Sequence, residues 1–136
     1  SVVGRAEHRR AGRPEVGLRQ LVDHETVVLP PHTRHRQEMD DIYRSFSASP
    51  RVAGTVSSIE AAIELISQGL GFTLADGIMR RTAVNRGCVM VPLTPSRSVT
   101  YAMIHPPIRT AHHGLEQVEE ALRARFLELA DNGPDP

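Results

Sequence analysis

Short apolar runs alternate along this chain with longer stretches that have helical spacing. The apolar runs predict strands over residues 26–29, 51–56, 72–75, 88–91 and 99–104. Between most of them lie stretches whose apolar residues recur three or four positions apart, as on one face of a helix. Strands that alternate with helices are typical of parallel sheets. We therefore predict a three-layer α/β fold, in which helices cover both faces of a mostly parallel sheet.

Two of the predicted helices carry the clearest signals. One begins at Thr33, and four apolar residues share one of its faces: Met39, Ile42, Tyr43 and Phe46. The other begins at Ser57, which has the spacing of a capping box with Glu60. It ends at Gly69, because glycine suits the left-handed conformation that closes many helices. These two helices frame the central part of the predicted sheet.

Three further helices have weaker signals. We predict a short helix over residues 16–22, another from Asp76 to about Asn85, and a last one from about His113. The last helix presents five apolar residues on one face: Leu115, Val118, Leu122, Phe126 and Leu129. An apolar stripe of this length tends to find a partner, so we expect self-association. The charged residues 5–15 predict a loop.

Composition and charge narrow the range of possible functions. A chain of 136 residues suits one domain, and its zero net charge gives no support for electrostatic binding to DNA. The sequence has no run of 18 apolar residues and its start lacks the apolar core of a signal peptide, so we expect a cytoplasmic location. A single cysteine, Cys88, excludes an intrachain disulfide and a zinc site built on cysteines.

Polar residues follow three of the predicted strands, and these are the candidate ligand positions. In open α/β sheets, ligands bind beyond the carboxyl ends of the strands. The residues at these ends that we expect to bind ligand are Pro31, His32, Thr33, Arg34, Ser57 and Asp76. Helix N-termini there favour an anionic or carbonyl ligand, and Arg34 or Arg36 would add a clamp on a carboxylate. The alternative is that Thr33, Ser57 and Asp76 only cap helices.

The histidines invite a metal hypothesis, which their spacing does not support. His32 and His35 lie three positions apart, and His112 and His113 are adjacent, but no second ligand pair has suitable spacing. Adjacent histidines in a polar turn are usually exposed to solvent. We therefore expect no metal and no cofactor.

No catalytic motif stands out either. The Gly-Leu-Gly around Leu70 precedes a predicted strand, whereas a dinucleotide-binding glycine motif follows one. Cys88 lies within an apolar run, as a core residue would. Glu60 and Glu64 lie one turn apart on the polar face of their helix, which indicates exposure to solvent. We expect that the protein is not an enzyme.

The segment VSSIEAAIELISQGLGFTLAD resembles the effector-binding region of LysR-type transcriptional regulators. The resemblance extends upstream through SVVGRAEHRRAGRPEVGLRQLVDHETVVLPPHTRHRQEMDDIY and downstream through GCVMVPLTPSRSVTYAMIHPP, so it covers about residues 2–130. No single motif decides the resemblance; the ordered set carries it. One departure is Ala75-Asp76, where the family often has Leu-Pro or Ile-Pro.

The resemblance implies a type 2 periplasmic-binding-protein-like fold, with two lobes joined by crossover strands and a ligand between them. Residues 1–104 would form the second lobe with its crossover strands, and residues 105–136 would carry a helix that returns to the first lobe. The implied ligand positions are the loop over residues 31–34 and the end of the strand that begins at Phe72. A winged helix-turn-helix, absent from this chain, would contact DNA.

The implied function is the sensing of a small-molecule effector, which biases the arrangement of a regulator dimer. A carboxylate-containing effector fits the helix N-termini, although the acidic Asp76 would disfavour an anion or pair with a cationic group. Whether the chain is a truncation or a natural short product stays open. The alternatives are a solute-binding protein with the same fold and a small α/β enzyme.

Overall fold

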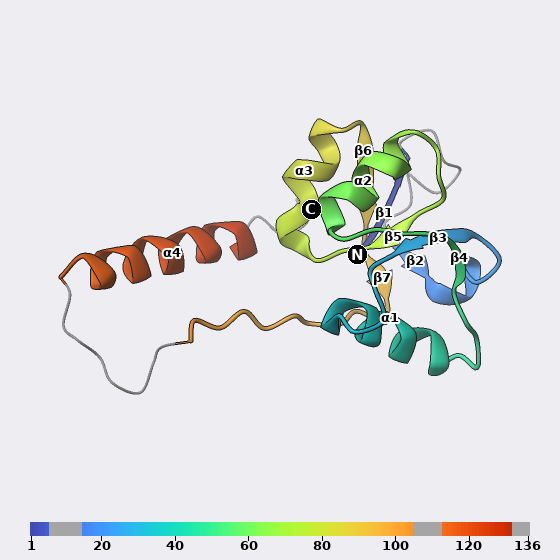
Figure 1. Ribbon diagram of the computed structural model, residues 1–136, viewed down its shortest axis with the longest axis horizontal. Coiled ribbons are helices and arrows are strands. Elements are labelled where there is room, and N and C mark those ends of the chain that lie inside the picture. The colour runs from blue at the N-terminus through green and yellow to red at the C-terminus, as the bar shows by residue number, and fades with distance from the viewer. Residues whose placement is uncertain (6–14, 105–112, 132–136) are drawn as a thin grey trace. The chain divides into compact units, whose positions relative to one another are not determined.

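The computed structural model describes residues 1–5, 15–104 and 113–131. The chain divides into two compact units, Ser1–Arg97 and Ser98–Pro136, and each is described by itself. Most of the predicted loop over residues 5–15 lies outside the described residues. The first unit contains every strand found in the described part of the chain (Figure 1).

The strands described in the first unit form a mixed sheet and a separate two-stranded pair. The seven strands are β1 (Val2–Arg5), β2 (Val16–Gly17), β3 (Glu25–Val28), β4 (Arg51–Thr55), β5 (Thr73–Leu74), β6 (Cys88–Val91) and β7 (Leu93–Thr94). β3 pairs parallel to β4, and a parallel bridge from Thr26 to Phe72 connects β3 to the residue before β5. β1 lies between β5 and β6 and is antiparallel to both. The spatial order is therefore β4-β3-β5-β1-β6, and β2 and β7 form a separate parallel pair.

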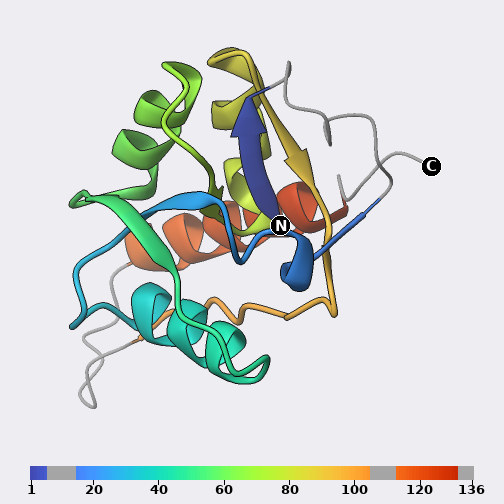
Figure 2. The same cartoon turned by 90° about the vertical axis from the view of Figure 1, so that its right-hand side faces the viewer.

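Side chains alternate between the two faces of these strands, as a buried sheet requires. Val2 and Val28 belong to a core cluster that contains Met39 and Tyr43 of helix α1 (Arg34–Arg44). Their neighbours Val3 and Val27 face the other way, toward helices α2 (Ile59–Ser67) and α3 (Arg80–Asn85). Figures 1 and 2 show α1 on one side of the strands and α2 and α3 on the other. The prediction of helices on both faces is confirmed.

Two of the predicted helix starts have different outcomes. Thr33 is the N-cap of α1, as predicted. The predicted cap of α2 at Ser57 is wrong by one residue, because Ser58 Oγ accepts the hydrogen bond from Ala61 N at 3.2 Å.

The predicted left-handed conformation of Gly69 is confirmed, with φ of 98°. The predicted segment after Asp76 is helical, as a short 3₁₀ turn η2 (Gly77–Met79) followed by α3.

The predicted helix over residues 16–22 is wrong. Val16 pairs with Leu93 in the β2–β7 ladder, and its N–H donates to the carbonyl of Pro92 at 2.9 Å. Only a 3₁₀ turn, η1 (Leu18–Gln20), follows. The apolar residues that suggested one helical face instead fill the α1-side core, where Leu18 and Leu21 are buried.

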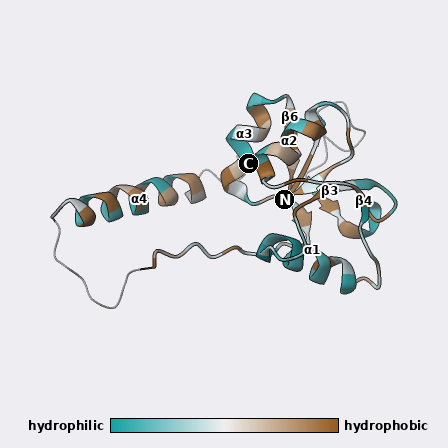
Figure 3. Ribbon diagram, in the orientation of Figure 1, coloured by the Kyte–Doolittle hydropathy of each residue, from teal (hydrophilic) through white to brown (hydrophobic). Residues whose placement is uncertain are grey.

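The second unit contains α4 (His113–Asp131) and the described residues 98–104. The predicted strand over residues 99–104 is wrong, because no strand ladder forms there in the part of the chain that the structure describes. Tyr101 instead packs on Phe126 of α4, with ring centroids 5.1 Å apart. Apolar residues recur along α4 (Figure 3), and Leu115, Val118 and Leu122 are exposed. None of the described helices is long and apolar enough to cross a bilayer.

Candidate functional site

The segments that follow β3, β4 and β5 meet at one edge of the sheet. Val28 is the register partner of Thr55, and Val56 N donates to the carbonyl of Val28 at 3.0 Å. On the other side of β3, Thr73 Oγ1 donates to the carbonyl of Val27 at 2.8 Å. Because the three strands are parallel neighbours, residues 30–34, residues 57–58 and Asp76 leave the sheet at the same end. We call these residues the strand-end edge.

A tight turn holds the first segment of the strand-end edge. Both the backbone N–H and the hydroxyl of Thr33 donate to the carbonyl of Pro30, at 3.0 and 2.8 Å. The same hydroxyl oxygen accepts from Arg36 N at 3.3 Å and so caps α1. Pro31 and His32 lie at the exposed apex of this turn. The turn therefore presents the start of α1, where helices have backbone N–H groups without an intrahelical partner, at the edge.

His35 connects this turn to the end of β5. Its Nε2 lies 2.8 Å from the carbonyl oxygen of Leu74, which only accepts, so this nitrogen carries the hydrogen and donates. The other ring nitrogen, Nδ1, is buried and has no hydrogen-bond partner among the described residues. His35 therefore links the first turn of α1 to the last residue of β5, two positions before Asp76. In the sequence, His35 stands out only as a possible metal ligand. The signal for its place at this edge is its position in the first turn of α1, directly after the Thr33 cap.

The two arginines predicted to bind a carboxylate differ in how exposed their side chains are. Arg36 is held in place, because its Nε pairs with Asp40 at 2.8 Å and its side chain is only 16% exposed. Arg34 pairs with Glu38 at 2.8 Å, but its side chain is 88% exposed. An exposed ion pair of this kind contributes little and exchanges readily with solvent. Of the two, Arg34 is the guanidinium that is able to turn toward a ligand.

The other two segments bring a hydroxyl and a carboxylate. Ser57 is exposed at the end of β4, and Ser58 beside it caps α2. Asp76 is half-buried after β5 and precedes η2, without a side-chain capping bond to that turn. Its backbone carbonyl accepts from Met79 N at 3.2 Å. The edge thus combines two helix N-termini, which attract negative charge, with one acidic side chain, which repels it.

Comparison with known proteins identifies the fold. Residues 1–127 match the profile of the family described as LysR substrate binding domain. The chain belongs to this family. Its effector-binding domains have the periplasmic-binding-protein-like fold, in agreement with the α/β arrangement of the first unit.

Solved structures of LysR-type regulators support the assignment. A putative LysR family transcriptional regulator from Pseudomonas aeruginosa is 25% identical, with a TM-score of 0.57 over 68% of this chain and 32% of that one. The effector-binding domain of QuiR, in complex with shikimate, is 15% identical with a TM-score of 0.65, over 71% of this chain and 46% of that one. The effector-binding domain of BenM, with benzoate, is 16% identical with a TM-score of 0.56, over 98% and 61%. No curated protein matches the chain.

The LysR-type domain described here spans only part of these neighbours. It covers a quarter of the length of HinK, a LysR family regulator from Pseudomonas aeruginosa to which it is 27% identical, and less than half of the effector-binding domain of QuiR.

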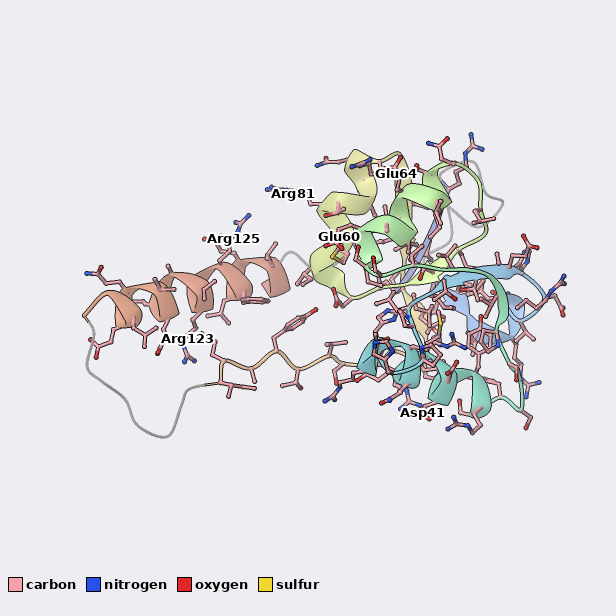
Figure 4. All side chains as sticks on the ribbon, in the orientation of Figure 1. Asp41, Glu60, Glu64, Arg81, Arg123 and Arg125 are labelled. Carbon is pink, nitrogen blue, oxygen red and sulfur yellow. The ribbon has the colours of Figure 1, made fainter. Side chains whose placement is uncertain are left out.

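The described part of this LysR-type domain offers few groups for metal binding or catalysis. The described residues contain no group of three His, Cys, Asp or Glu side chains that would hold a metal ion, and His112 lies outside them. Cys88 is buried, and burial raises the pKa of its thiol, so it is a poor nucleophile. Glu60 and Glu64 both lie on α2 (Figure 4). Glu60 is exposed, and Glu64 pairs with Arg86.

Proposed function

We propose that this chain forms one lobe of the effector-sensing domain of a LysR-type transcriptional regulator, with its ligand at the strand-end edge. The observation that carries the proposal is the convergence of the turn over residues 31–34, Ser57 and Asp76 beyond three parallel strands. In open α/β sheets this is the end at which ligands bind. Residues 1–104 would be the second lobe, and residues 105–136 would carry the helix that returns to the first.

The effector that suits this edge is a small carboxylate. The N-termini of α1 and α2 supply N–H groups and the positive ends of two helix dipoles. Arg34 adds an exposed guanidinium. QuiR binds shikimate and BenM binds benzoate, and both ligands are carboxylic acids, which supports this chemistry. Asp76 would face the hydroxyl or cationic part of the effector, because it repels the carboxylate.

In the intact regulator, effector binding would bias the arrangement of a dimer and so its contacts with DNA. Those contacts would be made by a winged helix-turn-helix outside this chain. α4 is not suited to that role, since Arg123 and Arg125 project from opposite sides of it (Figure 4). We propose that the protein acts without catalysis, in the cytoplasm.

Self-association follows from the apolar stripe of α4. In a complete domain, the first lobe would cover this stripe, and in this chain alone a second copy would cover it. Exposed residues on the stripe include Leu115, Val118, Leu122 and Phe126. The stripe is the physical reason to expect a dimer.

A solute-binding protein with the same fold is the second candidate. It would have the same strand-end edge but would need export and no DNA-binding part. The match to a family of regulator domains favours the sensing function.

Nuclear magnetic resonance on the 136-residue chain tests the ligand position. Titration with shikimate and benzoate should shift the amide signals of His32, Thr33, Arg34 and Ser57 before others. Because one lobe encloses only part of a ligand, calorimetry should find binding weaker than micromolar. Thr33→Ala, which removes the cap, should reduce the shifts, whereas Thr55→Ala on exposed β4 should not. Shifts confined to other residues, or micromolar affinity in this chain, would contradict the proposal.

A further inference from the structure

A cavity opens at the end of the sheet opposite the strand-end edge. Its volume is about 500 Å³. Arg5 at the end of β1, Glu25 at the start of β3 and Gly71 before β5 all line it. It therefore lies where β3 and β5 begin, whereas the strand-end edge lies where they end. Small-molecule sites are typically roughly 300–1,000 Å³, so the cavity has the size of a binding site.

The floor of the cavity is apolar. It belongs to the sheet face that packs on α1, and its lining there is Val2, Val16, Leu21, Phe72, Val89 and Val91. Gly4 also lines it, and a Cβ placed on Gly4 would meet no atom within 4 Å. Gly4 therefore adds no side chain to the lining, and a larger residue at this position would have room.

The rim of the cavity is charged. Asp23 and Glu25 supply two carboxylates, and both residues are exposed. Arg5 supplies one guanidinium, which lies near Gly69: its Nη1 is 3.5 Å from a Cβ placed there. Among the described residues that line the cavity, two carboxylates face one guanidinium. Arg51 Nη1 donates to the backbone carbonyl of Asp23 at 2.9 Å and helps to fix this turn.

We propose that this cavity, defined by the apolar floor, Gly4 and the rim carboxylates Asp23 and Glu25, is a second small-molecule site that binds small aromatic or branched aliphatic amines. The apolar floor takes the hydrocarbon part, and the carboxylates attract the ammonium group. The ligand class differs from that of the strand-end edge, where helix N-termini favour an anion. The site is independent of effector sensing, since it uses none of the same residues.

Three probes of the same size and different charge test the proposal: benzylamine, benzyl alcohol and benzoate. Each is titrated into the 136-residue chain and followed by amide chemical shifts. We expect benzylamine to shift Gly4, Asp23, Gly71 and Val89 with the lowest Kd, benzyl alcohol to bind there more weakly, and benzoate to bind there least. Benzoate binding at the cavity as tightly as benzylamine, or no shifts at these residues with any probe, would overturn the proposal.

Variants distinguish the contribution of the rim carboxylates to binding from that of the apolar cavity. Asp23→Asn and Glu25→Gln should each raise the Kd of benzylamine about two- to fivefold, the range for exposed ion pairs, and leave that of benzyl alcohol unchanged. Gly4→Val should fill the cavity and weaken both probes. The matched control is Gly17→Val, because a Cβ there also meets no atom within 4 Å and Gly17 does not line the cavity.

If Gly4→Val fails to fold, the two rim variants and the shift map of the unchanged protein still decide the question. Unchanged benzylamine affinity in the double variant Asp23→Asn, Glu25→Gln would refute the assignment of the ammonium group to the rim.

Discussion

Replacing Gly71 by alanine should separate β3 from β5, because no space exists for a side chain there. Gly71 has φ of 64°, in the left-handed region that favours glycine. A Cβ built on it would lie 2.1 Å from the carbonyl oxygen of Glu25 and 2.8 Å from the carbonyl carbon. These atoms are backbone atoms of β3, so one of the two segments must move.

The cost has two parts. An alanine in the left-handed region costs roughly 1–2 kcal/mol. Moving the backbone also disturbs two hydrogen bonds between the segments, from Phe72 N to the Glu25 carbonyl at 3.1 Å and from Val27 N to the Phe72 carbonyl at 2.8 Å. Each contributes about 0.5–1.5 kcal/mol net, so the expected loss for Gly71→Ala is about 2–5 kcal/mol.

Gly69→Ala is the matched control, two residues earlier in the same turn. Gly69 also has positive φ, 98°, but the nearest atom to its Cβ position is Arg5 Nη1 at 3.5 Å, the far end of a flexible side chain. Gly69→Ala should therefore lower the free energy of unfolding only by the cost of the left-handed backbone, roughly 1–2 kcal/mol. The effect of alanine on the unfolded chain is common to both variants and cancels in the comparison.

Urea unfolding followed by far-ultraviolet circular dichroism measures both variants. A loss for Gly71→Ala clearly larger than for Gly69→Ala supports the reasoning. Equal losses would refute it, because they would mean that the contact between Gly71 and the Glu25 carbonyl contributes nothing. Domains of this size have only about 5–15 kcal/mol of stability, so the difference is large enough to measure.

Three further predictions concern other residues. Tyr43 is fully buried and its hydroxyl has no hydrogen-bond partner among the described residues, so Tyr43→Phe should raise the free energy of unfolding by about 1 kcal/mol in urea melts. Burial raises the pKa of Tyr43 to about 12 from 10, so the folded state holds its proton longer than the unfolded state. Deprotonation of Tyr43 should therefore lower the free energy of unfolding of the unchanged protein as the pH rises from 10 to 12. Tyr43→Phe should lack this loss, and urea melts of both proteins at alkaline pH would detect the difference. Ser58→Ala should lower the free energy of unfolding by about 1 kcal/mol in thermal melts, whereas Ser57→Ala should leave it almost unchanged. A larger loss for Ser57→Ala would instead support Ser57 as the cap of α2. Sedimentation should find association at high concentration that Leu122→Arg reduces, and a strict monomer would exclude the role of the α4 stripe.

Features set by neighbouring residues were predictable from the sequence. The cap at Thr33, the buried face that carries Met39 and Tyr43, and the left-handed Gly69 each depend on contacts within a few positions. The error at Ser57 has the same origin, since two adjacent serines both satisfy the capping pattern. Only the backbone geometry selects Ser58, whose φ of −147° and ψ of 162° place its hydroxyl over the first turn.

Features set by distant pairing were not predictable. Val16 has the apolar neighbours of a helix, but its backbone is taken by Leu93 and Pro92. The antiparallel direction of β1 depends on its insertion between β5 and β6, which no local pattern encodes. Residues 99–104 show the converse, because their apolar pattern suits a strand and no paired strand lies within the described residues.

The strand-end edge also combines local features, which the sequence indicated, with long-range contacts, which it did not. Strand ends and helix caps were visible because each is marked by local polar residues after an apolar run. Their convergence depends on the order β4-β3-β5, and the bond from His35 to the Leu74 carbonyl joins residues 39 positions apart. That bond links the two segments with opposite electrostatic character, the N-terminus of α1 and the end of β5 that leads into Asp76. If the proposed carboxylate effector binds at this edge, His35 would act as a positioning residue for selectivity, because the carboxylate would lie between a helix dipole that attracts it and a side chain that repels it.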